Sequence, residues 1–398
     1  MEVGMKVVGW LILCLVVAVP VAAKTKVSVG GQVRPRFEVR DPAGTGHDVI
    51  TNMRVRANLK AKLDRDVSAF IQLQDVRLWG EETSTLGDFR ADNFDLHQGY
   101  IRFGDVGETA IDVTIGRQEM SLGGQRLVGA VGWTQQGRSF DGVRVSDSPK
   151  GGKVDLFLMR IGDESATAVS ANAYFGGAYV TVPVSGKKTG LDLYTLYNRT
   201  SGAADTELYT LGARIAGASG KLTYRGEASY QAGDVGGSDV AAYMAGARLG
   251  YKLTDKATLT LWGDLLSGDN DPTDGDIKVF NTLFATNHKF YGFADLFLNV
   301  PAHTNGQGLM ELAIKLSLKP KKGVSLGVDL HSFRLAEKRA LTSSRLGEEV
   351  DVTLGYKYSK QASIVVGGSY VFQKDALGAI GRLGEDMKWA YVMTNVAF

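Results

Sequence analysis

The sequence has few of the residues that cross-link or anchor an exported chain. Its single cysteine, Cys14, lies within the first 23 residues, so a chain processed after them would hold no thiol and no disulfide. No later stretch approaches the roughly 20 continuous apolar residues of a transmembrane helix. Amphipathic helical periods and an interdomain linker are also missing from the sequence. These absences exclude a disulfide-stabilised secreted domain and a helical membrane protein.

The first 23 residues have the composition of a secretory signal. Lys6 precedes an apolar run at 7–19, and Pro20 is followed by the small-residue cleavage site Val21-Ala22-Ala23. The apolar run is too short to span a bilayer as a helix. We predict that residues 1–23 are a cleaved signal peptide and that residues 24–398 form the mature chain.

Proline is also scarce, with 8 residues against 50 glycines, and the net charge is only +2. This near balance of charge hides a strong local excess of basic residues in 27–63. Apolar or small residues occupy every odd position in 27–39 and again in 53–63, and polar, mainly basic residues lie between them. Because side chains alternate across a strand, the two strands predicted here share one apolar face and one strongly basic face, on which Glu38 is the single acid.

The same alternation continues to the last residue and predicts eighteen strands, an even number that is typical of single-chain bacterial barrels. The expected strands are 27–39, 53–63, 67–77, 93–103, 109–117, 139–146, 153–161, 172–184, 190–199, 207–216, 221–231, 239–251, 256–266, 309–319, 323–335, 349–358, 361–373 and 387–398. Short turns alternate with longer loops, notably 118–138 and 267–308. In outer-membrane barrels the long connections are extracellular and the short turns periplasmic.

The width of such a sheet decides which solvent meets each face. A closed sheet of sixteen to eighteen strands encloses an aqueous channel, so apolar faces turned inward would line an empty void. Two soluble sandwiches would need a linker that the sequence lacks. We therefore predict an all-β fold, a transmembrane antiparallel β-barrel of eighteen strands, in the outer membrane of a Gram-negative bacterium.

Several motifs resemble the alginate export family of outer-membrane porins. They are Gly116-Arg117-Gln118-Glu119-Met120 with its continuation to Arg144, Phe280-Asn281-Thr282-Leu283-Phe284-Ala285-Thr286-Asn287-His288-Lys289, and the shorter stretches 74–80 and 96–100. The resemblance covers essentially the whole mature chain. It implies an eighteen-stranded monomeric channel with an arginine-rich constriction that passes an anionic polysaccharide.

Basic residues at inward positions are candidates for lining the pore, because rings of Arg or Lys select anions and a guanidinium binds a carboxylate bidentately. The inward alternation selects Arg34, Arg36, Arg54, Arg56, Lys60, Arg102, Arg214, Arg225, Arg248 and Lys315; Arg117, Arg126, Arg138 and Arg144 lie in or beside the first motif, as a loop that could fold into the channel. Alternatively, these charges form structural ladders with acids such as Asp192 and Asp264. If Arg34, Arg54 and Arg56 form the constriction, replacing all three by alanine should lower anion selectivity.

One acidic loop resembles a calcium loop in composition only. It contains Asp269, Asp271, Asp274 and Asp276 but lacks the EF-hand spacing and the closing glutamate, so a solvated acidic loop is the favoured interpretation. We expect no cofactor and no catalytic residues. An outer-membrane hydrolase is the least favoured function, since the sequence contains no G-x-S-x-G and no serine with an obvious histidine partner.

The leading hypothesis is passive diffusion of anionic saccharides or polysaccharides, such as alginate-like uronates, through a basic lumen. The alternative is a general or substrate-specific uptake porin for small anions or other solutes. Expected partners are outer-membrane lipid and lipopolysaccharide, the barrel assembly machinery through the C-terminal strand ending in Phe398, and periplasmic secretion components if the channel exports. We expect a monomer that binds no nucleic acid.

Overall fold

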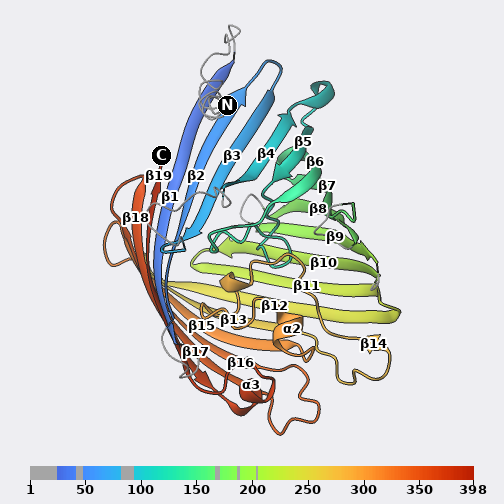
Figure 1. Ribbon diagram of the computed structural model, residues 1–398, viewed down its shortest axis with the longest axis vertical. Coiled ribbons are helices and arrows are strands. Elements are labelled where there is room, and N and C mark those ends of the chain that lie inside the picture. The colour runs from blue at the N-terminus through green and yellow to red at the C-terminus, as the bar shows by residue number, and fades with distance from the viewer. Residues whose placement is uncertain (1–24, 42–47, 82–93, 166–170, 186–188, 203–204) are drawn as a thin grey trace, which may run out of the picture.

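Eighteen antiparallel strands of the described chain close into a barrel, which confirms the predicted fold (Figure 1). The computed structural model describes residues 25–41, 48–81, 94–165, 171–185, 189–202 and 205–398; the predicted signal peptide lies outside these ranges. The strands are β1 (Lys26–Asp41), β2 (Asp48–Lys62), β3 (Val67–Leu78), β4 (Phe94–Phe103), β5 (Asp112–Gln118), β6 (Phe140–Asp147), β7 (Lys153–Gly162), β8 (Asn172–Ser185), β9 (Thr189–Ser201), β10 (Thr206–Ser219), β11 (Leu222–Val235), β12 (Ser238–Thr254), β13 (Ala257–Leu266), β15 (Leu309–Leu318), β16 (Val324–Arg334), β17 (Arg345–Lys357), β18 (Ala362–Gln373) and β19 (Met387–Ala397). A further two-residue strand, β14 (Asp276–Ile277), pairs in parallel with β12.

Each strand of the barrel pairs with its neighbours in sequence, and β19 closes the barrel on β1. At this seam Gly31 exchanges two backbone hydrogen bonds with Phe398, with N···O distances of 2.8 and 3.1 Å. A Cβ atom on Gly31 would lie 2.8 Å from the Phe398 ring and from the Arg56 carbonyl oxygen. The absence of a side chain at position 31 therefore lets the last residue pack against the first strand.

The outer face of the barrel is apolar along alternate positions of the strands. Leu211 and Leu312 have 67% and 71% of their surface exposed, and many other aliphatic and aromatic side chains share this face. Exposed apolar side chains on every strand require hydrocarbon as their solvent, as in outer-membrane barrels. The short turns lie at one end of the barrel and the long loops at the other.

The inner face is more apolar than the alternation suggested. Toward the long loops, the inward positions of β6 to β19 carry buried apolar residues such as Phe175, Met244, Phe333 and Trp389. They pack against apolar residues of the loops, including Phe280, and form one core cluster. The expectation of a polar lumen face along the whole strand is therefore wrong for this half of the barrel, because folded loops replace water there.

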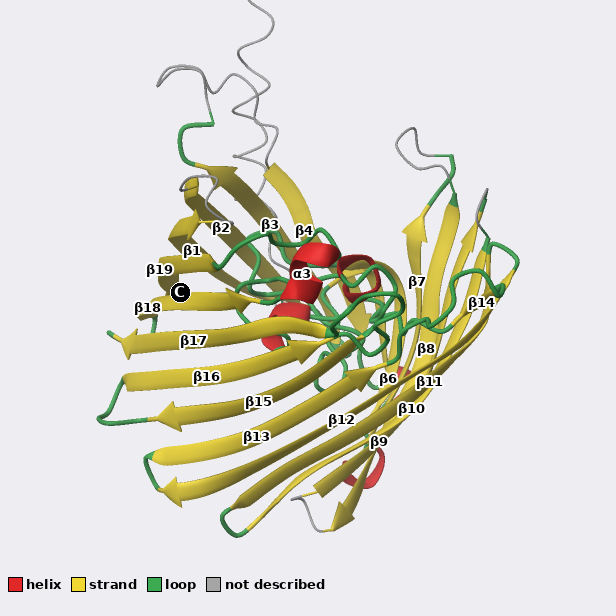
Figure 2. Cartoon of the chain, turned by 90° about the horizontal axis from the view of Figure 1, so that it is seen from below, coloured by secondary structure: helices red, strands yellow, loops and turns green. Residues whose placement is uncertain are grey.

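Two long loops lie inside the ring of strands (Figure 2). Loop A comprises residues 119–139, and loop B comprises residues 267–308 with β14, the 3₁₀ helix η4 (Asn287–Lys289) and α2 (Val300–His303). The other short helices are η1 (Val106–Glu108), η2 (Pro149–Gly151) and α3 (Asp375–Ala379). None of the described helices has the length and hydropathy needed to cross a membrane.

Candidate functional site

The basic face of the first hairpin holds loop A inside the barrel. Arg34 donates from Nη1 to the Gly132 carbonyl at 2.7 Å, from Nη2 to the Thr134 carbonyl at 2.6 Å, and from Nε to Gln135 Oε1 at 2.9 Å. Arg54 donates to the Gln135 carbonyl at 3.1 Å. Both arginines are buried, with 6% and 3% of their surface exposed. Their donors are engaged by the loop backbone, so these two residues bind the protein's own chain.

Arg36 and the residues around it extend this attachment through an aromatic cluster. Its guanidinium lies 4.4 Å above the Trp133 ring and donates to Glu38 at 2.8 Å. Trp133 also stacks on the ring of His288 in loop B, and the two ring centroids are 4.2 Å apart. Trp133 thus connects the first hairpin to both loops, and its ring contacts are made by the protein rather than left for a sugar.

Arg56 forms the third attachment of loop A, through a carboxylate. Glu119 Oε1 lies 3.2 Å from Arg56 Nη1 and 2.7 Å from His97 Nε2. Burial raises the pKa of Glu119, but the hydrogen bond with His97 and the charge of Arg56 outweigh it and hold the pKa below its ordinary value. Glu119 is therefore a charged anchor at neutral pH.

Two arginines of the first motif join loops A and B. Arg138 donates to the carbonyls of Phe284 and Ala285 in loop B, and burial lowers its pKa. Arg126 is 1% exposed; it forms an ion pair of 2.7 Å with Asp264 and contacts Glu227 at 3.5 Å. Both side chains lie inside the barrel as predicted, but their donors hold the loop core together.

Loop B is fixed to the barrel wall by two carboxylates of β17, a strand that only β18 and β19 separate from β1. Glu349 accepts a hydrogen bond from the Ala294 amide at 2.8 Å, and Asp351 accepts one from the Phe293 amide at 3.2 Å. Gly292 adopts a φ of +80°, and a Cβ there would lie 2.4 Å from Glu349. The close approach of the loop backbone to the wall therefore requires glycine at this position.

Three cations gather around the contacting rings of Trp262 and Phe290, and none of them forms an ion pair with a carboxylate among the described residues. Arg225 lies 4.8 Å and Arg248 5.5 Å from the indole centroid, and neither forms an ion pair with another described residue. Lys289 of η4 donates to the Gly124 carbonyl at 3.2 Å. Burial, followed by the charges of Arg225 and Arg248, lowers the pKa of Lys289. We name Arg225, Arg248 and Lys289 the cation cluster.

Four other predicted lumen cations are neutralised by acids on adjacent strands, as in the ladder interpretation. The pairs are Arg102 with Asp112 at 2.6 Å, Arg144 with Asp155 at 2.7 Å, Arg214 with Asp192 at 2.6 Å and Lys315 with Asp329 at 2.9 Å. Lys60 is exposed.

The expected lumen position of Arg117 is wrong. On β5 it shares the outward set of positions with Ile115, which is 47% exposed. It pairs with Asp141 at 2.6 Å, and Asp141 lies opposite Arg160 in the register of β6 and β7. Residue 117 is the last but one of the strand, so strand alternation rather than loop folding sets its direction.

The acidic residues 269–276 are engaged by protein groups. Lys278 Nζ lies 2.5 Å from Asp274 and 3.8 Å from Asp276, Asp271 accepts from Thr273 at 2.6 Å, and Asp269 lies 3.8 Å from Arg339. The described part of the chain contains no group of three or more side chains that could hold a metal ion.

The sequence reasoning missed Lys289 and the loop core that positions it. The signal that could have found them is the density of aromatic residues in loop B, since Phe280, Phe290 and Phe297 are unusual in a loop that faces water. All three are fully buried. Burying each such side chain contributes about 1.5–3 kcal/mol, enough to hold the loop within the barrel.

Comparison with known proteins agrees with this architecture. A family model described as alginate export matches residues 25–388. Among solved structures, OpdO of Pseudomonas aeruginosa shows a TM-score of 0.66 at 12% identity, covering 94% of this chain and 97% of that one. OccAB4 of Acinetobacter baumannii shows a TM-score of 0.65 at 10% sequence identity, covering 94% of this chain and 98% of that one. The outer membrane protein OprD of P. aeruginosa shows a TM-score of 0.63 at 12% sequence identity, covering 94% of each chain. No sequence of a curated protein matches the chain.

Proposed function

Since this chain belongs to the alginate export family and its barrel lies in the outer membrane of a Gram-negative bacterium, we propose that it is a channel for anions, with acidic saccharides as the substrate class. The family and the fold are those of porins and channels. The observation that carries the proposal is the cation cluster, in which Arg225, Arg248 and Lys289 lack a carboxylate partner among the described residues.

Unpaired cations in a barrel attract anions more effectively than paired ones. The low-dielectric walls of a narrow passage focus the field of a few charges, whereas the four ladder pairs contribute little net potential. Arg225 and Arg248 lie against an indole, which holds their planes without neutralising their charge. Arg248 is half-buried and Arg225 is 4% exposed, so a carboxylate passing this wall would contact mainly Arg248 and feel the charge of Arg225 behind it, and it could still leave because the contacts are few.

Small anions are the second candidate substrate, favoured by a different observation. Loops A and B pack together through the bridge between Val128 and Phe284 and lie inside the ring of strands (Figure 2). Such loops narrow the passage, and a narrow passage favours single solutes over a polymer. Monouronates and oligouronates of increasing length separate the two candidates by the size at which they stop crossing.

The test replaces Arg225 and Arg248 by glutamine and measures reversal potentials in planar bilayers under a salt gradient. We expect the preference for anions to fall about tenfold, the equivalent of ~1.4 kcal/mol of electrostatic stabilisation. Current block by oligouronate should weaken in parallel. The charge-matched control replaces Arg117 and Arg160 by glutamine on the outer face and should leave both readouts unchanged. Equal reversal potentials in wild type and the Arg225/Arg248 variant would reject the proposal.

A further inference from the structure

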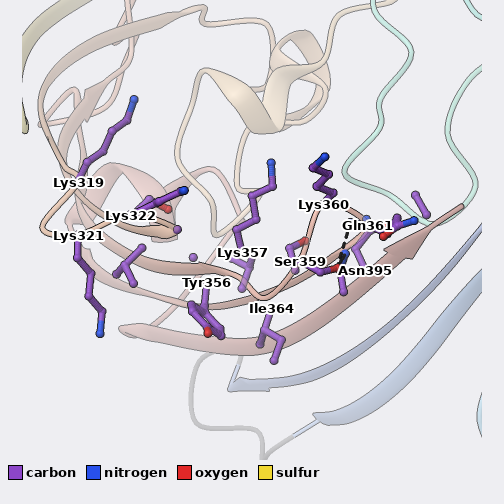
Figure 3. Close-up of a pocket in the computed structure, with 18 of the residues that line it drawn as sticks. Lys319, Lys321, Lys322, Tyr356, Lys357, Ser359, Lys360, Gln361, Ile364 and Asn395 are labelled. Carbon is purple, nitrogen blue, oxygen red and sulfur yellow. Dashed lines mark hydrogen bonds between the residues drawn. The ribbon is translucent and has the colours of Figure 1, made fainter.

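A hollow of about 710 Å³ lies at the short-turn end of the barrel (Figure 3). Its walls come from the turns that join β12 to β13, β15 to β16 and β17 to β18, and from the end of β19. In an outer-membrane barrel this end faces the periplasm. The hollow is therefore part of the periplasmic mouth.

Six lysines line this hollow: Lys256, Lys319, Lys321, Lys322, Lys357 and Lys360. No aspartate or glutamate is among the described residues that line it, all six lysines are exposed, and none forms an ion pair with a described residue. Six like charges on three neighbouring turns repel one another, and nothing in the fold requires them. Lumen cations such as Arg102, Arg214 and Lys315 are each paired with an acid, whereas these six lysines are not, which indicates a ligand of opposite charge.

The pairing register of β17, β18 and β19 shows that the hollow opens toward the lumen. Lys357 pairs with Ser363, and Ser363 with Asn395, so the three side chains share one face of the sheet. Asn395 accepts a hydrogen bond from Gln32, which in turn accepts one from Arg54, the residue that holds loop A inside the barrel. In Figure 3, Lys357 and Lys360 point to the opposite side from Tyr356 and Ile364, which belong to the lipid-facing set.

We propose that this lysine cradle captures an acidic saccharide chain from the periplasm and delivers it to the lumen. The proposal deepens the proposed function and rests on it for the fate of the captured chain. Lysines spaced along three turns suit carboxylates spaced along a flexible chain. Ser325, Ser363 and Asn395 between them offer hydrogen bonds to sugar hydroxyls.

The direction of the side chains favours a saccharide over anionic lipid headgroups. Headgroups contact the outer rim of the barrel, where Lys321 points together with Tyr356 in Figure 3. Lys319, directly after β15, continues its inward set, because Leu312 and every second residue from it, such as Met310 and Ile314, face lipid. The inward lysines are beyond the reach of lipid outside the wall but lie on the route of a solute.

The test replaces Lys319, Lys357 and Lys360 by glutamine and adds oligouronate to one side of a planar bilayer at a time. We expect the rate at which blocking events begin to fall about tenfold or more when the saccharide is added at the short-turn side, as electrostatic steering predicts. The rate from the loop side should not change, and the difference should vanish in high salt. The matched control replaces Lys26, Lys62 and Lys221, three exposed lysines of the same rim outside the hollow, and should behave as wild type.

A binding assay keeps this proposal separate from the proposed function. Oligouronate binding to the detergent-solubilised barrel is measured for wild type, the cradle variant and the control. Loss of binding in the cradle variant alone supports the cradle even if the wild-type channel shows no anion preference. Unchanged binding and an unchanged blocking rate would overturn it. So would unchanged oligouronate binding with reduced binding to phosphatidylglycerol vesicles, since the cradle would then be a lipid site.

Discussion

At the scale of single residues, the lumen arginines divide into those that hold the protein and those that are free to meet a solute. Inward direction could be predicted from strand alternation, and it is correct for Arg34, Arg54 and Arg225. Their partners could not be predicted, because Arg34 binds residues about one hundred positions away in loop A. Only a folded loop decides whether a guanidinium faces a carbonyl or water. Arg117 shows a different error, since the motif around it suggested a side chain folded into the channel, whereas its place on β5 turns the side chain outward.

The engaged donors of Arg34 and Arg54 give a prediction that differs from the original one for these residues. Replacing both by glutamine should release loop A, because each lost hydrogen bond to a charged group costs about 1.5–3 kcal/mol. Cleavage within loop A by added protease should rise at least about tenfold. Anion selectivity, which we assign to the cation cluster, should change less than protease sensitivity. The control Arg102→Gln breaks a wall pair that does not touch loop A, and equal protection of loop A in both variants would contradict this assignment.

Glu119 makes the attachment of loop A dependent on pH. Its pKa in the folded chain lies below the ordinary value of 4.5, so its anchoring is complete at neutral pH and is lost as pH falls below 4.5. Trp133 fluorescence, obtained by difference from a Trp133→Phe variant, should report loosening of the loop in that acid range. The variant Glu119→Gln should show no transition there. A transition that persists in Glu119→Gln would assign the pH dependence to another group.

At the scale of elements, alternation predicted all eighteen barrel strands, because one face of each strand meets lipid along its whole length. It could not predict β14, which has two residues and no period of its own. It also gave β11 and β17 four residues too few at the long-loop end. There the inward positions are apolar and the two faces no longer differ. Packing against loop B, rather than contact with a watery lumen, explains that change.

A charge on the lipid-facing side of one strand tests the orientation of all of them. Leu211 lies on the outer face of β10, and Leu211→Arg should destabilise the barrel by about 2–4 kcal/mol, the cost of arginine near the middle of a bilayer. Reversible unfolding from lipid vesicles measures this difference. Leu211→Val is the control and should cost much less. Equal free energies of unfolding for wild type and Leu211→Arg would mean that water, not hydrocarbon, covers this face.

At the scale of the whole molecule, the barrel is a conduit with two basic regions. The lysine cradle lies at the periplasmic mouth and the cation cluster lies against loops A and B, so an anion entering by the short turns would meet them in that order. The near-neutral total charge of +2 gave no hint of this division. Net charge sums the whole chain, whereas passage depends on which cations remain unpaired along one face.

The most direct test of this account is the reversal potential of the purified wild-type barrel in a planar bilayer that separates two concentrations of the same salt. We expect stable conductance and a potential whose sign shows that anions cross more readily than cations. A potential near zero, or one with the sign of cation preference, would contradict it.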